Sequence, residues 1–211
     1  PRYHQLDVIR KLRTDIKEVS VGKNYLIQHT TGSGKSFSIG WLSHMLTSLY
    51  KSKEDTNRVF DSIIVITDRK VLDKQLQNTL TQLEKTKGVV QKIDKDSKQL
   101  RESLEQGKSI IVTTIQKFSV VVEKMTELKG KTFGVVIDEV HSSQTGESAK
   151  NLKKVLSYSE SDEDDDNDSL LDIIKKEQDS RKSQSHISFF GFTGTPKNKT
   201  LELFGTKLMT G

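Results

Sequence analysis

A stretch of eight residues near the start of the chain, "HTTGSGKS" at His29–Ser36, has the composition of a phosphate-binding loop. The usual pattern is G-x-x-x-x-G-K-[ST], which Gly34, Lys35 and Ser36 match, whereas His29 stands where the first glycine belongs. In such a loop the backbone N–H groups and the start of the next helix form a concave anion site. The lysine then reaches the β and γ phosphates, and the serine hydroxyl holds Mg²⁺. The pattern therefore predicts a site for a nucleoside triphosphate with Mg²⁺.

The surroundings of this loop decide between a nucleotide site and a simple Gly/Ser turn with an incidental lysine. A short strand pattern precedes the loop at 24–28 and a helical pattern follows it at 35–50, which is the context that a phosphate loop requires. Glycines in the loop allow the backbone to approach phosphate oxygens without a Cβ in the way. The residues expected to bind the nucleotide here are Thr31, Gly32, Ser33, Gly34, Lys35 and Ser36.

A pair of carboxylates supplies the second half of the predicted chemistry. Asp138 and Glu139 follow the apolar run "FGVVI", so they are expected at the carboxyl end of a buried strand, where parallel sheets bind ligands. We expect Asp138 and Ser36 to hold Mg²⁺, and Glu139 to polarise the attacking water. Two adjacent carboxylates are costly unless a cation lies near them. The alternative, an ordinary acidic pair on the surface, is disfavoured by the apolar run before it.

Strands and helices must alternate to position these loops. Continuous or near-continuous apolar runs predict strands, and apolar residues at helical spacing predict helices. The expected strands are 24–28, 62–67, 109–113, 133–138 and 187–193, and the expected helices are 3–19, 35–50, 71–83, 97–106, 116–124 and 146–156. Such alternation implies right-handed crossovers, hence an α/β fold whose mostly parallel sheet is covered by helices on both faces.

Composition narrows the class of protein. The 211 residues include no cysteine, which excludes thiol catalysis and disulfides and fits the cytoplasm. Net charge is +5, although residues 160–172 hold eight acidic residues and no Lys or Arg. A basic body with an acidic insert suits a binder of polyanions, and we expect 157–172 to form a solvated surface loop. No stretch reaches the roughly 20 apolar residues that cross a bilayer, so no membrane partner is expected.

The order Asp-Glu-x-His after a phosphate loop resembles motif II of superfamily 2 helicases and translocases. Their first motif tolerates a residue other than glycine at the position of His29. "GFTGTP", residues 191–196, resembles their motif III. The resemblance implies a RecA-like three-layer sandwich and a catalytic role for His141. It also implies that Thr193, Gly194 and Thr195 couple the nucleotide site to the DNA track through contacts with His141.

Six blocks in order make the resemblance narrower: "RYHQ", "HTTGSGKS", "ITDRKVLDKQ", "TTIQKF", "DEVHSSQ" and "GFTGTP". Together they resemble the motor (R) subunit of type I restriction enzymes and cover nearly the whole chain. The resemblance implies ATP and Mg²⁺ as cofactors, double-stranded DNA as the track, modification and specificity subunits as partners, and a role in ATP-driven DNA translocation before cleavage. It also implies that Gln5 reads adenine, for which a side-chain amide is chemically suited. The residues that would contact the DNA backbone are Thr67, Asp68, Arg69, Thr113, Thr114 and Gln116.

Several interpretations stay open at this stage. In the family, a nuclease domain and a second RecA-like lobe with its arginine finger flank such a unit, so we interpret residues 1–211 as a single first lobe. Another superfamily 2 helicase acting on DNA or RNA, or a nucleotide-dependent binding module without motor activity, are the rival functions. An arginine within the chain, Arg69 or Arg181, is an alternative source of the finger. Asp61 with Asp68-x-Lys70 loosely matches a nuclease pattern, although that short pattern recurs by chance.

Overall fold

Six parallel strands form one sheet in a computed structural model of the chain, in the order β1-β6-β5-β2-β4-β3. The structure describes residues 1–30, 32–67, 70–84, 88–93, 97–115, 124–125, 127–128, 130–140 and 186–204. The strands are β1 (Tyr25–Gln28), β2 (Ser62–Thr67), β3 (Val90–Lys92), β4 (Ile110–Thr114), β5 (Phe133–Ile137) and β6 (Ile187–Thr193). The described helices are α1 (Tyr3–Val19), α2 (Lys35–Thr47), α3 (Lys70–Gln82), α4 (Ser97–Glu105) and α8 (Asn198–Phe204). The predicted α/β fold with a parallel sheet is confirmed.

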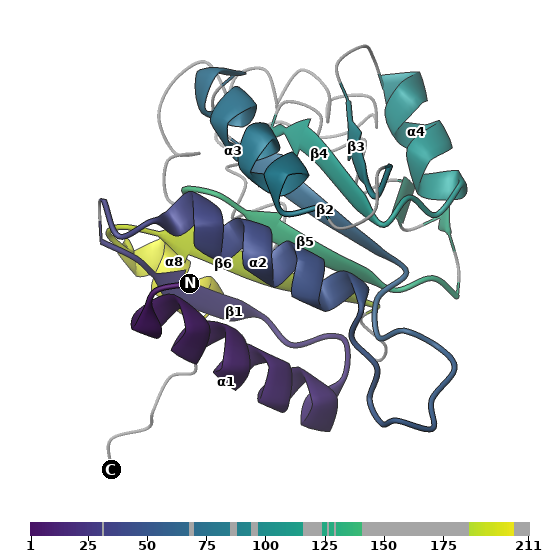
Figure 1. Cartoon of the computed structure of the whole chain (residues 1–211), viewed down its shortest axis with the longest axis horizontal. Helices are drawn as coiled ribbons and strands as arrows, with labels where there is room; N and C mark the ends of the chain where they lie inside the picture. Colours follow the sequence, from purple (N-terminus) through teal and green to yellow (C-terminus); the bar gives the residue numbers. More distant parts are fainter. Residues whose placement is uncertain are drawn as a thin grey trace, which may run out of the picture.

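Helices cover both faces of the sheet because the central strands are apolar on both sides. On β2, Ile63 and Val65 join the core beneath α1, α2 and α3, whereas Ile64 and Ile66 face the opposite core, to which α4 and α8 contribute. Figure 1 shows α1, α2 and α3 lying across one face. All six residues of β2 are buried, as expected for a strand covered on both faces.

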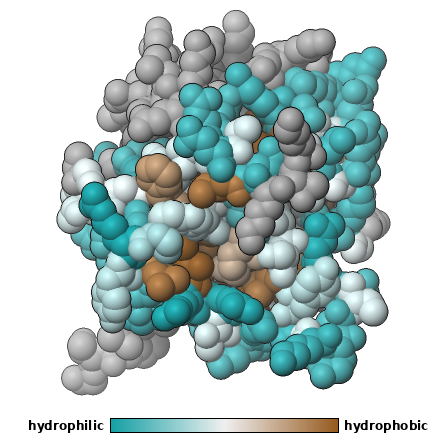
Figure 2. Space-filling view, in the orientation of Figure 1, coloured by the Kyte–Doolittle hydropathy of each residue, from teal (hydrophilic) through white to brown (hydrophobic). Residues whose placement is uncertain are grey.

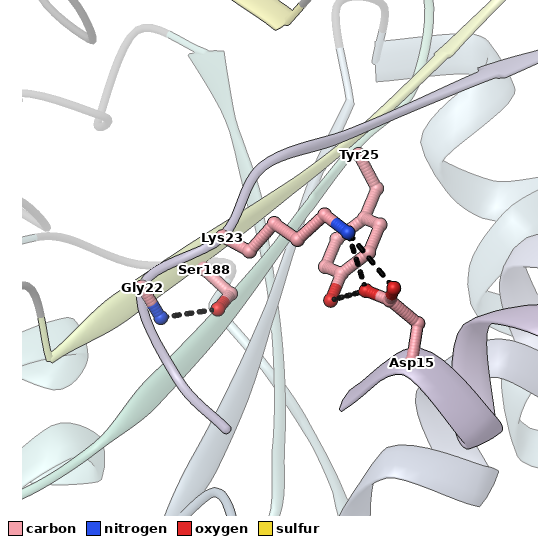
Figure 3. Close-up of polar contacts among 5 residues, drawn as sticks. All are labelled: Asp15, Gly22, Lys23, Tyr25 and Ser188. Carbon is pink, nitrogen blue, oxygen red and sulfur yellow. Dashed lines mark hydrogen bonds and ion pairs between the residues drawn. The ribbon is translucent and has the colours of Figure 1, made fainter. Parts of the chain in front are cut away.

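The amino ends of the strands are tied to α1 by polar contacts (Figure 3). The Lys23 ammonium lies 2.8 Å from both Asp15 carboxylate oxygens, and the Tyr25 hydroxyl donates to Asp15 Oδ2 at 2.8 Å. The backbone N–H of Gly22 donates to Ser188 Oγ at 2.8 Å, which joins the α1–β1 turn to the start of β6. These contacts fix α1 against β1 at the amino end of that strand, and the phosphate loop follows its carboxyl end.

The predicted ranges 3–19, 62–67 and 187–193 match α1, β2 and β6 at both ends, and the other predicted elements that the structure describes differ by one to three residues at one or both ends. The helix α2 ends at Thr47 instead of Tyr50, because the hydroxyls of Thr47 and Ser48 bond back to helix carbonyls at its last turn. Two short elements, β3 and α8, were not predicted. The predicted helices 116–124 and 146–156 and the acidic stretch 157–172 lie wholly or almost wholly outside the described residues.

The face that carries α1 and α2 is mostly hydrophilic, with apolar residues gathered near its centre (Figure 2). Phe37, on the exposed side of α2, is 45% exposed and packs near the Trp41 ring. Among the described residues, no helix is both long and apolar enough to cross a membrane.

Candidate nucleotide site

The phosphate loop joins β1 to α2 with two glycines in the left-handed region. Gly32 has φ +78° and Gly34 φ +85°, conformations that glycine adopts without strain. Gly34 is the N-cap of α2, and its carbonyl accepts from the N–H of Ser38 at 3.2 Å. The first turn of α2, with Lys35 and Ser36, therefore begins directly at the loop, as the sequence pattern predicted.

Lys35 reaches across to the two carboxylates that follow β5. Its Nζ lies 3.0 Å from Asp138 Oδ1 and forms a short ion pair with Glu139 Oε1. The lysine side chain is 18% exposed and that of Asp138 is 10% exposed, so this contact is largely shielded from water. The three residues predicted to do the central chemistry thus meet at one place.

The backbone at Glu139 explains how two adjacent carboxylates reach one ammonium. In an extended strand successive side chains point to opposite faces. Glu139 instead has φ +52°, in the left-handed region, directly after the strand. Pairing with the neighbouring strands continues on both sides of it, because Asp138 N–H donates to Ile66 O and Val140 N–H donates to Phe192 O. A non-glycine residue in this region carries backbone strain, which the surrounding structure must hold in place.

The side chains available suit Mg²⁺. Hard divalent cations prefer oxygen ligands, and Mg²⁺ is commonly held by one or two protein oxygens with substrate phosphates and water. Ser36 supplies a hydroxyl in the first turn of α2, and Asp138 supplies a buried carboxylate. The Asp138 Oδ1 atom lies 3.0 Å from the Lys35 ammonium, so a metal ion would take the place of that ammonium. The site thus fits a magnesium ion completed by phosphate oxygens.

Gln5 has a role that the sequence did not reveal. Its side chain is buried, at 3% exposed, and its Oε1 accepts from the Arg2 N–H at 2.7 Å. Its Nε2 donates to the Gly34 carbonyl at 2.9 Å. Both ends of the amide are therefore engaged by the start of α1 and by the phosphate loop. Adenine reading by Gln5 stays a prediction, and it would require these bonds to change.

The residues predicted to line the DNA backbone are placed less favourably. Thr67 and Thr113 are each 1% exposed, and their hydroxyls are buried without a hydrogen-bond partner in the described structure. Thr114 is half-buried. Only after a movement of the surrounding loops could Thr67 or Thr113 touch a ligand, so DNA contact by these two residues remains a prediction.

The predicted coupling segment follows β6. Thr193 is fully buried and its carbonyl accepts from the His29 N–H at 2.8 Å, so this segment is joined directly to the phosphate loop. Gly194 is half-buried and Thr195 is exposed. Five further site residues lie outside the described residues: Thr31, Asp68, Arg69, Gln116 and His141.

The loose nuclease pattern is described only at its first residue. Asp61 precedes β2, where its Oδ2 accepts from the N–H and hydroxyl of Thr132. Asp68 lies outside the described residues, so a nuclease site that uses both carboxylates stays untested.

Comparison with known proteins agrees with this geometry. The family model described as SWI2/SNF2 ATPase matches residues 4–161. A type I restriction enzyme endonuclease subunit of Staphylococcus saprophyticus is 26% identical over 99% of this chain and 20% of its own length. The chain thus spans about a fifth of that relative.

Two solved structures share the fold. The helicase domain of Hef from Pyrococcus furiosus superposes with a TM-score of 0.57 at 14% identity, over 96% of this chain and 35% of that one. A nuclease-deletion mutant of the Type ISP restriction-modification enzyme LlaGI, solved with a DNA substrate mimic, gives 0.54 at 16% identity, over 93% and 18%. The resemblance to type I restriction subunits is confirmed by the curated relatives, and the RecA-like fold by the helicase structures. The phosphate loop and the acidic pair of this chain meet in space, as Lys35 and Asp138 show. Since the family model also covers most of the chain, the chain belongs to the SWI2/SNF2 ATPase family.

Proposed function

We propose that this chain is the ATP-binding lobe of a double-stranded DNA translocase within a type I restriction enzyme. The observation that carries the proposal is the Lys35 ammonium held between Asp138 and Glu139 at the mouth of the phosphate loop. The relatives among type I endonuclease subunits support the restriction setting. Modification and specificity subunits and a second RecA-like lobe are the proposed partners, and the cytoplasm is the proposed location.

Lys35 is the residue whose contacts must change when ATP binds. In the structure its charge is balanced by two carboxylates. Triphosphate oxygens at the loop would offer the ammonium a stronger anionic partner, and Lys35 would turn from Asp138 and Glu139 toward the β and γ phosphates. Mg²⁺, held by Ser36 and Asp138, would neutralise charge on the phosphates when bound. This exchange keeps Lys35 and Asp138 each next to an opposite charge in a site with little water.

Glu139 is then released to act on water. Freed from Lys35, its carboxylate would orient and deprotonate the water that attacks the γ phosphate. Because its side chain is 30% exposed, compared with 10% for Asp138, it is the more accessible of the two to water. The division of labour follows from burial: the shielded carboxylate serves the metal and the more open one serves the nucleophile.

Duplex DNA is the proposed track. LlaGI, whose fold the chain shares, was solved with a DNA substrate mimic. The segment after β6 is hydrogen-bonded to the phosphate loop through Thr193 and His29, so a change in the loop can reach residues 193–195. This connection is the proposed route by which the state of the nucleotide alters the grip on DNA.

The proposal is tested by ATP hydrolysis in the full-length protein with duplex DNA, single-stranded DNA and RNA. Lys35→Ala should abolish binding of a fluorescent ATP analogue. The matched control is Lys23→Ala, which also removes a lysine from an ion pair but at the amino end of β1, away from the phosphate loop. Unchanged analogue affinity in Lys35→Ala would overturn the nucleotide site. Stimulation by RNA alone would favour another superfamily 2 helicase, and no stimulation by any nucleic acid would favour a binding module without motor activity.

A further inference from the structure

His29, the residue that replaces the first glycine of the loop, is held in a defined position. It is buried, at 6% exposed, immediately after β1. Its ring lies 5.9 Å from the Phe192 ring and 5.7 Å from the His4 ring. Its Nδ1 lies 2.8 Å from Ser33 Oγ, in hydrogen-bond contact across the loop. The side chain at the first position of the loop, His29, is therefore hydrogen-bonded to the residue at the fifth position, Ser33.

The same serine is held from the other side by α1. His4 Nε2 donates to the Ser33 carbonyl at 3.1 Å, and Gln5 Nε2 donates to the next carbonyl, that of Gly34, at 2.9 Å. A phosphate loop presents N–H groups to the anion, so its carbonyls must turn away and find donors elsewhere. Here α1 supplies a donor to each of two consecutive carbonyls, of which that of Gly34 also accepts from the N–H of Ser38. His29 contacts the side chain of Ser33.

Space next to His29 makes its hydrogen bond consequential. A cavity of about 290 Å³ is lined by His4, Val8, Ile27, Gln28, His29, Thr30 and Ser33. The imidazole therefore has room on one side and is not fixed by close packing alone. Burial, with His4 and Lys35 nearby, lowers the pKa of His29 below its usual 6.5, which favours the neutral ring. A neutral ring can donate or accept at Nδ1, and the Ser33 hydroxyl can match either tautomer.

We propose that His29 is a positioning residue of the phosphate loop: its hydrogen bond to Ser33 holds the loop open for phosphate in place of the flexible first glycine. The inference rests on the proposed function in that the phosphate is that of ATP. It assigns His29 a contribution to nucleotide affinity through loop geometry and no contact with the reacting atoms. The variant residue in the pattern is thus a device for pre-organising the loop, which lowers the entropy lost on binding.

Two substitutions separate the hydrogen bond from the ring. His29→Asn keeps a polar atom close to the position of Nδ1 but removes the ring, whereas His29→Phe keeps the ring contact with Phe192 but removes the hydrogen bond. Nucleotide affinity of the full-length protein is measured with a fluorescent ATP analogue. We expect His29→Asn to bind within about twofold of the parent and His29→Phe to bind about 3- to 10-fold more weakly, the range of one hydrogen bond. If His29→Phe binds the analogue more tightly than His29→Asn, the proposal is overturned, because His29 would then support the loop through packing of its ring and not through the hydrogen bond.

A second arm separates this inference from the proposed function. Hydrogen exchange of the backbone amides of residues 32–36 is measured without nucleotide, and His29→Phe should exchange faster there than His29→Asn. Ser33→Ala should raise the exchange rates as much as His29→Phe does. The double variant that combines these two substitutions should exchange no faster than either one, since both remove the same hydrogen bond. If the parent fails to bind the analogue while these exchange rates differ as expected, the nucleotide assignment fails but the positioning role of His29 is supported. Equal exchange in all variants, or additive effects in the double variant, would overturn the positioning role of His29.

Discussion

At the scale of single residues, the site is a balance of charge around one lysine. Asp138 and Glu139 converge on Lys35 because Glu139 adopts a left-handed backbone conformation directly after β5. Without that turn the second carboxylate would point to the other face of the sheet. The two acids differ in burial, and this difference predicts different consequences when each is neutralised.

Glu139→Gln should leave nucleotide binding intact or slightly tighter, because one of the two anions that compete for Lys35 is removed. Hydrolysis should fall by about 10² to 10⁴-fold, the usual contribution of a general base. Asp138→Asn should instead raise the Mg²⁺ concentration needed for half-maximal activity. Both are measured as steady-state ATP turnover of the full-length protein against Mg²⁺ concentration. Parental turnover in both variants would mean that the acidic pair has been misassigned.

A pH dependence follows from His29. The folded state lowers the pKa of this histidine, chiefly through burial and also through His4 and Lys35, so the unfolded chain binds its proton more readily. The neutral His29 should therefore make its full contribution to the free energy of unfolding above pH 6.5. That contribution should decline as the pH falls below 6.5 toward the lowered pKa. Urea unfolding between pH 5 and pH 8 should show this decline in the parent and a shallower one in His29→Asn. Identical profiles would contradict it.

At the scale of elements, α1 acts as a brace for the phosphate loop. Its first turn bonds to the loop through His4 and Gln5. Near its other end, Asp15 contacts Lys23 and Tyr25, the first residue of β1 (Figure 3). The helix α1 is therefore bonded to the loop at its amino end and to the start of β1 near its carboxyl end. A change in the loop backbone should alter the contacts of His4 and Gln5.

The two loop glycines provide a matched pair for that coupling. An alanine Cβ at Gly34 would lie 2.7 Å from Gln5 Nε2, whereas one at Gly32 would meet nothing within 4 Å. Both have positive φ, so each alanine costs about 1 kcal/mol in strain. Gly34→Ala should cost about 1 kcal/mol more, because Gln5 must give up its hydrogen bond to the loop. Urea unfolding measures the difference, and Gln5→Ala in both backgrounds should remove it; a difference that survives Gln5→Ala would place its cause elsewhere.

Sequence reasoning predicted the long elements because apolar periodicity records burial directly. The β2 run "SIIVIT" is buried throughout, and α1 buries Ile9, Leu12 and Ile16 at helical spacing. The strand β3 escaped prediction because its three residues are half-exposed at the edge of the sheet, where no apolar pattern is required. The grouping of Lys35 with Asp138 followed from the rule that loops at carboxyl ends meet. The buried amide of Gln5 and the His29–Ser33 contact depend on how α1 docks on the loop, which residue spacing does not encode.

At the scale of the whole molecule, the parallel sheet gathers the phosphate loop, the acidic pair and the end of β6 at the carboxyl ends of its strands. All the phosphate and metal contacts predicted here therefore come from one side of the nucleotide. In the proposed motor the opposite side belongs to a second lobe. The chain spans about a fifth of its curated relative from S. saprophyticus, a length that leaves room for such a lobe.

The 211-residue chain on its own should therefore bind ATP weakly and hydrolyse it very slowly. An arginine supplied across the site in such motors contributes roughly 10³ to 10⁵ in rate. At about 1.4 kcal/mol per tenfold, its absence removes on the order of 4 to 7 kcal/mol of transition-state stabilisation. Duplex DNA should stimulate the isolated chain little, because the proposed DNA track also spans both lobes. Steady-state ATP hydrolysis by the chain and by the full-length protein, each with and without duplex DNA, measures this. DNA-stimulated turnover of the chain near that of the full-length protein would mean that an arginine of its own, Arg69 or Arg181, completes the site.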